Sequence, residues 1–401
     1  MRPPPRRLDP CPCGSGRRYR DCHGALGAEG PPPDARVAQA VQMRLRGEAA
    51  AAREACEAVL AAHPDHVGAL NLRGLLLQDA LDVAGALASF ERAIALAPGV
   101  ADAHFNRSLA LLLLGRYAEG WAEYEWRTRL PGYADYAHHD FGMPRWRGEP
   151  LAGRRLLVHA EQGHGDTIQF ARFLAPLAAR GVAIDLFCHP PLRPLLARVA
   201  GVATAMASLD ERPTHDFHAP IADVAAHFLP DTAAAHWWGP YLAASPGRRA
   251  RFEPALAMHA RPRIGLAWKG SPRHLNDRNR SLDAAMAARL VAPGATFVSL
   301  QQGAAPLAGT VSVLPEEADW DDTAAVIASL DRVVTVDTAI AHLAGAMGKP
   351  VHVLLPYNPD WRWGLAGEAT RWYPSMRLFR QARPGEWGPV IERVVQAYGD
   401  A

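Results

Sequence analysis

The sequence predicts a protein of mixed class, in which a short α-helical solenoid precedes two α/β halves built on parallel strands. Three observations support this fold class. Small and aromatic residues recur with a period of 34 residues between residues 33 and 134. Two runs typical of buried strands, at 154–160 and 263–268, are each followed by a glycine-bearing loop. The pattern of a third stretch, 331–356, predicts a strand, a helix and a second strand.

The composition favours a globular protein without a nucleic-acid partner. The 401 residues suffice for two or three domains with substantial cores, and a net charge of +2 implies no polyanion-binding field. No apolar run approaches the roughly 18 residues of a membrane span. The start, rich in Arg and Pro, lacks the apolar core of a signal peptide, and five cysteines do not suggest a secreted disulfide scaffold. We therefore expect a cytoplasmic, bacterial protein with no membrane span.

Residues 1–30 contain four soft metal ligands in a compact pattern. Cys11 and Cys13 are one residue apart, a Gly-Ser-Gly turn follows, and Cys22 and His23 are adjacent. Three thiolates and an imidazole can close a tetrahedral zinc site. The segment resembles the SEC-C motif, whose usual role is that of an accessory docking element. We therefore expect one structural zinc, held by these four residues.

A proline linker, 31–33, leads into three repeats that span 33–134. The middle unit, with Gly74, Ala86, Phe90 and Pro98, fits the tetratricopeptide consensus. In such units small residues lie where two helices cross closely, and a proline ends the second helix. The concave face of such a solenoid usually binds peptide, so we expect a polypeptide partner. The alternative is a solenoid that only braces the next domain.

An aromatic junction, 135–152 with Tyr136, Phe141 and Trp146, precedes the first α/β half. We place this half at 153–245 and the second at 260–401. In the first half we expect a helix from Ile168 to Arg180 and a helical tail around 237–244. The expected strands lie at 154–160, 182–188, 202–207 and 216–221 in the first half, and at 263–268, 296–301, 311–314, 333–336 and 351–355 in the second.

The most informative stretch is 331–356. Val333 to Val336 forms a β-branched run, Asp337 and Thr338 follow it, and either could cap the next helix. That helix, 339–347, should end before Pro350. The polar residues of the stretch 331–356 therefore cluster at the carboxyl end of a strand. Open α/β sheets bind ligands at that edge, where helix amides can hold a phosphate.

Two motifs connect the chain with known enzymes. The run from Val336 to Ala346 resembles the donor-binding motif of lipopolysaccharide heptosyltransferases and their relatives. A similar site occurs in the tetratricopeptide-linked O-GlcNAc transferases. The loop from Glu161 to Gln169 resembles the Gly-Asp motif at the start of heptosyltransferases. The motifs occur in the expected order over roughly 150–400, and the resemblance implies a GT-B fold, in which two Rossmann-like halves enclose a cleft.

Sugar transfer from a nucleotide-sugar requires a base for the acceptor hydroxyl and cations for the departing phosphate. By the resemblance, Asp166 would be the catalytic base. His164, two residues earlier, is a rival base. A competing structural interpretation of Asp166 is an ordinary helix N-cap.

The positive charge that stabilises the phosphates of the nucleotide-sugar donor would come from Lys269, Arg273 and Arg280. By the resemblance, Lys269 matches the phosphate-binding lysine of the family. Only two of the 43 basic residues are lysines, so a surviving lysine suggests a need for its compact ammonium. GT-B enzymes are generally metal-independent, so no catalytic metal is expected. The remaining donor-binding candidates are Gln301, for base or ribose, Asp337 and Thr338, and His342, for diphosphate or ribose. In the structural alternatives, Lys269 would be a solvated loop residue and His342 a buried core residue.

These features predict an inverting, metal-independent glycosyltransferase with a nucleotide-sugar as co-substrate. The order of repeats and transferase resembles protein-modifying enzymes, including bacterial flagellin glycosyltransferases, so we expect a polypeptide acceptor. One alternative is a heptosyltransferase-like enzyme that acts on a glycan or lipid acceptor. Another is a non-catalytic adaptor that binds partners through the repeats and the zinc motif. The joint presence of Asp166, Lys269, Asp337 and His342 argues against the adaptor.

Overall fold

The computed structural model describes residues 8–10, 12–13, 15–19, 31–131, 139–210, 212–229 and 237–399. Three of the expected zinc ligands (Cys11, Cys22 and His23) and Tyr136 lie outside these residues. The contacts divide the chain into two compact units, 1–103 and 104–401. In the described part of the chain, no helix is both long and apolar enough to cross a membrane.

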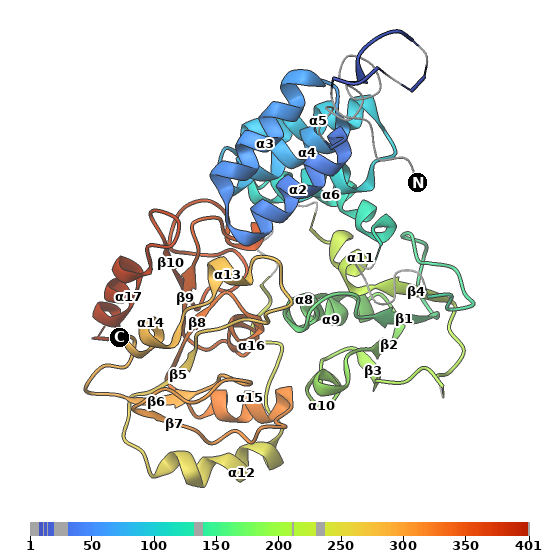
Figure 1. Ribbon diagram of the computed structural model, residues 1–401. Coiled ribbons are helices and arrows are strands. Elements are labelled where there is room, and N and C mark those ends of the chain that lie inside the picture. Colours follow the sequence, from blue (N-terminus) through green and yellow to red (C-terminus); the bar gives the residue numbers. More distant parts are fainter. Residues whose placement is uncertain are drawn as a thin grey trace. The chain divides into compact units, whose positions relative to one another are not determined.

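The first unit is built from helices joined in pairs (Figure 1). The paired helices start at 33, 67 and 101, so the spacing between successive pairs is the 34 residues predicted from the sequence. A buried cluster that includes Val37, Cys56 and Leu70 holds the pairs together. Its helices are α2 (Pro33–Arg46), α3 (Ala49–Ala62), α4 (Val67–Asp79), α5 (Val83–Leu96) and the start of α6 (Ala101–Leu113).

The third helix pair groups with the second unit. It consists of the rest of α6 with α7 (Tyr117–Tyr124), and a 3-10 helix, η2 (Glu125–Arg129), follows directly. A Cβ at Gly120 would lie 2.7 Å from Leu112 Cδ2, so the two helices cross closely where only a glycine fits.

The first α/β half contains a four-stranded parallel sheet in the order β3-β2-β1-β4. The central strand β1 has β2 on one side and β4 on the other, so the strand order reverses beside it. Asp166 lies in the first turn of α8, the helix that follows β1. The elements are β1 (Arg155–His159), α8 (His164–Phe170), η3 (Ala171–Phe173), α9 (Leu174–Ala178), β2 (Ala183–Phe187), η4 (Pro190–Leu192), α10 (Arg193–Leu196), β3 (Val202–Met206), β4 (Phe217–Pro220) and α11 (Ile221–Ala226).

The second half contains a six-stranded parallel sheet in the order β10-β9-β8-β5-β6-β7. Here the order reverses between β5 and β8, which is where open parallel sheets bind ligands. The elements are α12 (Pro246–Ala257), β5 (Arg263–Ala267), α13 (Asp277–Arg280), α14 (Ala284–Ala288), β6 (Thr296–Ser299), β7 (Thr310–Val311), α15 (Trp320–Ala328), β8 (Arg332–Val336), α16 (Ala339–Ala346), β9 (Val351–Leu355), η5 (Trp361–Trp363), β10 (Met376–Arg380), α17 (Trp387–Gln396) and η6 (Ala397–Gly399).

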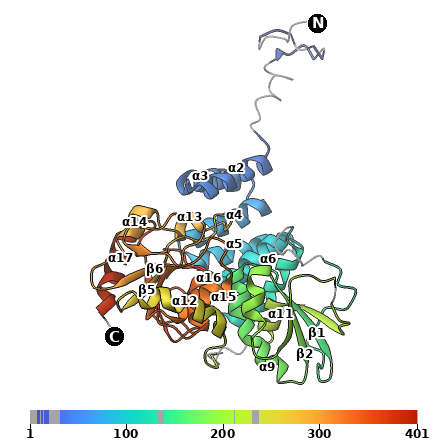
Figure 2. The same ribbon diagram turned by 90° about the horizontal axis from the view of Figure 1, so that it is seen from below.

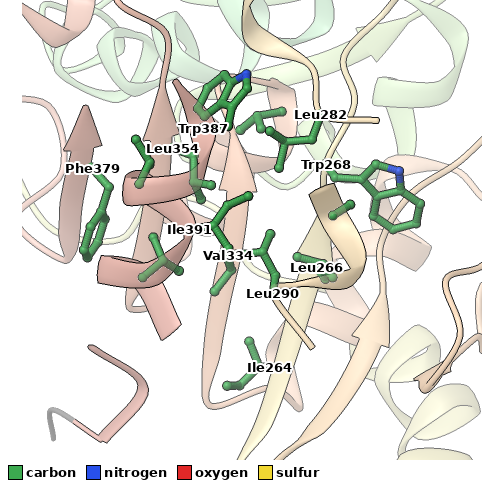
Figure 3. Packing of buried hydrophobic residues seen from close by; sticks show 14 of the residues in the cluster. Ile264, Leu266, Trp268, Leu282, Leu290, Val334, Leu354, Phe379, Trp387 and Ile391 are labelled. Atoms are coloured by element: carbon green, nitrogen blue, oxygen red, sulfur yellow. The ribbon is translucent and has the colours of Figure 1, made fainter. Parts of the chain in front are cut away.

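Helix α17 covers one face of the second sheet, and α14 lies near it (Figure 2). Ile391 and Trp387 of α17 point toward Val334 of β8 and Leu354 of β9 (Figure 3). All four side chains are at most 5% exposed. This apolar layer fixes the strands whose carboxyl ends carry the predicted donor residues. Two parallel α/β halves after a helical region confirm the α/β part of the predicted fold class and give a GT-B-like arrangement. The tetratricopeptide solenoid and the zinc knuckle stay predictions.

One expected helix is absent. The described residues 237–245 form no helix, although the aromatic residues Trp237 and Tyr241 have helical spacing. Instead, the backbone N–H groups of Tyr241 and Leu242 both donate to the carbonyl oxygen of Ala346, at 3.0 and 3.3 Å. These bonds satisfy a carbonyl at the end of α16, so a contact distant in sequence overrides the local preference.

The close crossing of α4 and α5 gives a test of the helical unit. A Cβ at Gly74 would lie 2.3 Å from Phe90 Cε1, so we expect Gly74→Ala to destabilise these helices by about 1–3 kcal/mol. Gly68, also in α4, is exposed, and a Cβ there would have only ordinary contacts of 3.5 Å or more. Gly68→Ala should therefore stabilise α4 by about 0.5 kcal/mol. Native-state hydrogen exchange of α4 and α5 amides measures both. Equal effects would contradict the close crossing.

Candidate functional site

The N-termini of helices α8 and α16 meet between the two α/β halves. Gly165 of α8 packs tightly against α16, because a Cβ there would lie 3.1 Å from His342 Cδ2 and 3.4 Å from Ala339 Cα. The absence of a side chain at this glycine admits the neighbouring helix. The loop with the predicted base is thereby brought against the predicted donor motif.

Asp166 lies in the first turn of α8, and its carboxylate pairs with the guanidinium of Arg362 in the second half. The Asp166 side chain is 23% exposed, whereas that of Arg362 is 8% exposed. Helix α8 already begins at His164, with Gly163 in the cap position, and no capping side-chain bond is found among the described residues. Asp166 is therefore not the N-cap of its helix, and its carboxylate makes a contact with the second half.

His164 points away from this pair, toward two other rings. Its Nδ1 accepts a hydrogen bond from the indole Nε1 of Trp320, at 2.9 Å, and its ring lies 4.8 Å from that of His189. Burial, with a smaller contribution from His189, lowers the pKa of His164 to about 4. The ring is therefore neutral near pH 7, with its proton on Nε2, because Nδ1 acts as the acceptor.

The loop after β5 folds around the carboxylate of Asp277. Ser281 Oγ donates to Asp277 Oδ1 at 2.9 Å, and Arg280 Nε donates to the same oxygen at 3.2 Å. A Cβ at Gly270 would lie 2.5 Å from both Asp277 Oδ1 and Arg280 Nη2, so the loop closes only over a glycine. Arg280 Nη1 then donates to the backbone carbonyl of Asp337 at 2.9 Å. Arg280 is thus fixed at the carboxyl end of β8.

Two further cations of this loop, Lys269 and Arg273, are exposed. Gln301 positions the first of them. Its Oε1 accepts from the backbone N–H of Trp268 at 3.1 Å and of Lys269 at 2.9 Å, and its Nε2 donates to the carbonyl of Gln302 at 3.0 Å. The amide oxygen of Gln301 therefore holds the backbone at the end of β5, while its nitrogen is bonded to the neighbouring carbonyl of Gln302. The other lysine, Lys349, donates to the carbonyls of Ala328 and Leu330 at the end of α15.

Asp337 and Thr338 lie between β8 and α16. Thr338 is the N-cap residue of α16, and its Oγ1 lies 3.1 Å from Thr335 Oγ1. Within the described residues, its side chain makes no capping hydrogen bond. Asp337 is 9% exposed, and burial, followed by the charge of Asp360, raises its pKa to about 6. Arg280 opposes this rise in the pKa.

His342 is buried in α16. Its Nδ1 lies 3.1 Å from the hydroxyl of Tyr373, and its ring stacks on Trp363 at a centroid distance of 5.4 Å. Burial, followed by the charge of Arg362, holds the pKa of His342 well below its usual range. It is therefore a neutral ring that packs against α8.

The structure thus brings Asp166, Arg280, Asp337, Thr338 and His342 to one edge, and adds residues that the sequence analysis did not select. The electrostatic neighbours of His274 come from both halves and include Arg280, Asp360 and Asp166. Arg362 and Asp360 were not among the residues predicted from the sequence. The signal that could have identified them is the alternation of an aspartate and an arginine with two tryptophans, because a charge among large apolar residues needs a partner if it is buried.

The metal site can be located only in part. Of the four expected ligands the structure describes Cys13, which is exposed. Among the described residues, no group of three or more His, Cys, Asp or Glu side chains could hold a metal ion.

Two separate segments of the chain match known families. Residues 300–368 match glycosyltransferase family 9 (heptosyltransferase), and residues 9–25 match the SEC-C motif. The family match indicates a glycosyltransferase, and it spans Gln301, Asp337, Thr338, His342 and Arg362. Protein FlbA of Caulobacter vibrioides is 28% identical over 426 residues, which span 86% of this chain and 69% of that protein.

Two solved structures are also similar. A glycosyl transferase family 9 protein from Veillonella parvula is 12% identical with a TM-score of 0.47, and the match covers 63% of this chain and 98% of that one. The ADP-heptose lps heptosyltransferase II of E. coli is 16% identical with a TM-score of 0.43, and the match covers 61% of this chain and 97% of that one.

The raised pKa of Asp337 predicts a pH-dependent cost of folding. Its pKa is about 6 in the fold and 3.8 ordinarily, so between those values the unfolded chain loses a proton that the fold retains. Wild-type stability should therefore fall, relative to Asp337→Asn, by about 2–3 kcal/mol as the pH rises from 4 to 7. Below about pH 3 the carboxyl is protonated in both states and the difference should be constant.

Thermal unfolding of both proteins across this pH range measures the difference. Asp360→Asn serves as a matched check, because it removes the neighbouring charge that is the second cause of the shift. In that variant the loss of stability with pH should be smaller. Parallel curves for wild type and Asp337→Asn would contradict the burial argument.

Proposed function

We propose that this protein is an inverting, metal-independent glycosyltransferase that moves a sugar from a nucleotide-sugar to an acceptor hydroxyl. The observation that carries the proposal is the meeting of α8 with α16, which places the carboxylate of Asp166 beside the donor motif. A base near positively charged groups is what this reaction requires. Arg280 and the exposed Lys269 and Arg273 supply the charge from one loop.

In the reaction, Asp166 accepts the proton of the acceptor hydroxyl while the hydroxyl oxygen attacks the anomeric carbon of the sugar. The bond from that carbon to the diphosphate oxygen breaks on the opposite face, so the configuration inverts. The nucleoside diphosphate leaves with the electron pair. Lys269, Arg273 and the amides at the start of α16 stabilise its charge without a metal ion.

The geometry favours Asp166 over His164 as the base. A base needs a lone pair directed at the substrate, and the acceptor nitrogen of His164 is occupied by the indole N–H of Trp320. Asp166 Oδ1 faces Arg362, whereas Oδ2 faces Gly163, where a Cβ would lie 3.3 Å away. A glycine at this position therefore leaves room beside Oδ2 for an acceptor hydroxyl.

Two other expected donor ligands receive more limited roles in this proposal. Gln301 acts through Lys269, whose backbone it clamps. His342, buried and neutral, supports the junction of α8 and α16, so it does not carry charge to the diphosphate. Asp337 and Thr338 remain the polar residues next to the start of α16, where the phosphates would lie.

The roles of base and donor cation predict opposite kinetic effects. Asp166→Asn keeps the shape of the side chain, so it should lower turnover by about 10²–10⁴-fold with nearly unchanged donor affinity. Lys269→Ala should weaken donor binding first. Release of nucleoside diphosphate from ADP-heptose and UDP-GlcNAc, with thermal shift as the measure of binding, separates the two effects. Near-normal turnover in Asp166→Asn together with an inactive His164→Ala would transfer the role to the histidine.

For the acceptor, we propose a polypeptide that the tetratricopeptide-like helices recruit. The support is the 34-residue spacing of the helix pairs, which is typical of peptide-binding solenoids. The zinc motif, with Cys11, Cys13, Cys22 and His23 as ligands, would be an accessory docking element. A glycan or lipid acceptor is the second candidate, because the matching family is described as heptosyltransferase.

Transfer of labelled sugar distinguishes these acceptors. The full-length protein is incubated with a radiolabelled donor and with either delipidated cell protein or the lipid and glycan fraction of the same bacterium. We expect label in the protein fraction that a protease releases as labelled peptides. Asp166→Asn is the matched control and should label neither fraction. Label confined to the lipid and glycan fraction would establish the heptosyltransferase-like alternative.

A further inference from the structure

The guanidinium of Arg362 is the side chain of the second half that reaches Asp166, and its position is fixed from several sides. It donates to Asp166 Oδ1, to Gln169 Oε1 and, at 2.9 Å, to Asp360 Oδ1. The Cζ atom of Arg362 lies 4.5 Å from the ring centre of Trp361 and 5.5 Å from that of Phe170. With its side chain only 8% exposed, Arg362 has few alternative conformations.

The short helix η5 aims this guanidinium. Asp360 caps η5, because its Oδ1 also accepts from the backbone N–H of Arg362 at 3.0 Å. Trp361 and Trp363 are both buried, and the indole of Trp372 donates to the carbonyl of Arg362 at 2.7 Å. The backbone of Arg362 is therefore held by the second half, while its side chain ends in the first half.

We propose that Arg362 is the positioning residue for Asp166, fixing Oδ1 so that Oδ2 faces the acceptor. This inference rests on the proposed function, in which Asp166 is the base. A misplaced base lowers turnover even when substrate binding is intact. Because Arg362 belongs to the opposite half, the base is oriented only while α8 and η5 are in contact.

The sharing of one guanidinium by two carboxylates suits this role. Arg362 forms ion pairs with both Asp360 and Asp166, and its Nε donates a hydrogen bond to Gln169 Oε1. A lysine in this position would keep the positive charge but could not reproduce the planar fork. Charge and geometry can therefore be separated by substitution.

The test is a double-mutant cycle of Arg362→Gln and Asp166→Asn, with release of nucleoside diphosphate measured for the better of ADP-heptose and UDP-GlcNAc. Arg362→Gln alone should lower kcat by about 10–10²-fold with the donor KM nearly unchanged. In the Asp166→Asn background it should change kcat by no more than about threefold, because the residue that it positions is already inactive. Arg362→Lys should recover little of the lost kcat.

Arg172→Gln is the matched control. Arg172 is also a buried arginine between the halves, and it donates to the carbonyl of Trp372 at 2.9 Å. Any effect of Arg172→Gln should multiply with that of Asp166→Asn, because its partners do not include the carboxylate. Guanidinium chloride should raise the kcat of Arg362→Ala and leave that of Arg172→Ala unchanged, a response that a purely structural role would not give.

The outcomes distinguish this inference from the proposed function. Multiplicative effects of Arg362→Gln and Asp166→Asn, or full activity of Arg362→Lys, would overturn the positioning role and leave Asp166 as the base. Near-normal turnover in Asp166→Asn, or a wild-type protein that releases nucleotide from neither donor, would overturn the proposed function itself. If Arg362→Gln fails to fold, Arg362→Lys in the same cycle decides between these outcomes.

Discussion

Burial of two arginines between the α/β halves is the constraint on which the site depends. Arg172 and Arg362 are 3% and 8% exposed, and each donates to groups on both sides of the junction. A guanidinium removed from water is tolerated only if its donors are satisfied and its charge is compensated. Local separation of the halves would break the bond of Arg172 to Trp372 and those of Arg362 to Asp166 and Gln169. The contact between α8 and α16 is therefore held by polar groups as well as by apolar packing.

The loop between β1 and α8 is fixed near both of its ends by such pairs. At its start, Glu161 is buried and accepts from Arg127 at 2.9 and 3.0 Å. Just beyond its end, in the first turn of α8, Asp166 pairs with Arg362. Arg127 comes from η2, directly after the third helix pair, and also pairs with Asp223 of α11 at 2.7 Å. The proposed base thus lies in a segment whose conformation depends on elements from three parts of the second unit.

The donor loop shows the same principle on a smaller scale. Asp277 gathers Ser281 and Arg280, and Arg280 in turn reaches the carbonyl of Asp337. Gln301 holds the backbone at Lys269. Lys269 and Arg273 are exposed on this ordered backbone, so the loop can present charge to a ligand without reorganising its own framework. Such preorganisation is what makes electrostatic stabilisation effective.

The sequence alone determined the order of the elements and the edge at which the site lies. The β-branched run before Asp337, Gly348 and Pro350 define β8, α16 and β9 through local preferences, and the 34-residue period defines the helix pairs. Asp166, Lys269 and Asp337 follow buried strands, which can be read from hydrophobic runs. The same reasoning placed a helix at 237–244, where bonds to Ala346 impose an extended chain.

Only the tertiary structure decided what the polar side chains do. Asp166 and Arg362 are 196 residues apart in the sequence, and Gln169 and Arg362 are 193 apart, so no local pattern contains their pairing. The neutral state of His342 and the raised pKa of Asp337 likewise follow from burial between distant segments. Local propensity acts over a few residues, whereas hydrogen bonding and desolvation depend on everything within a few ångströms in space. The elements were therefore predictable, but the chemistry of their ends was not.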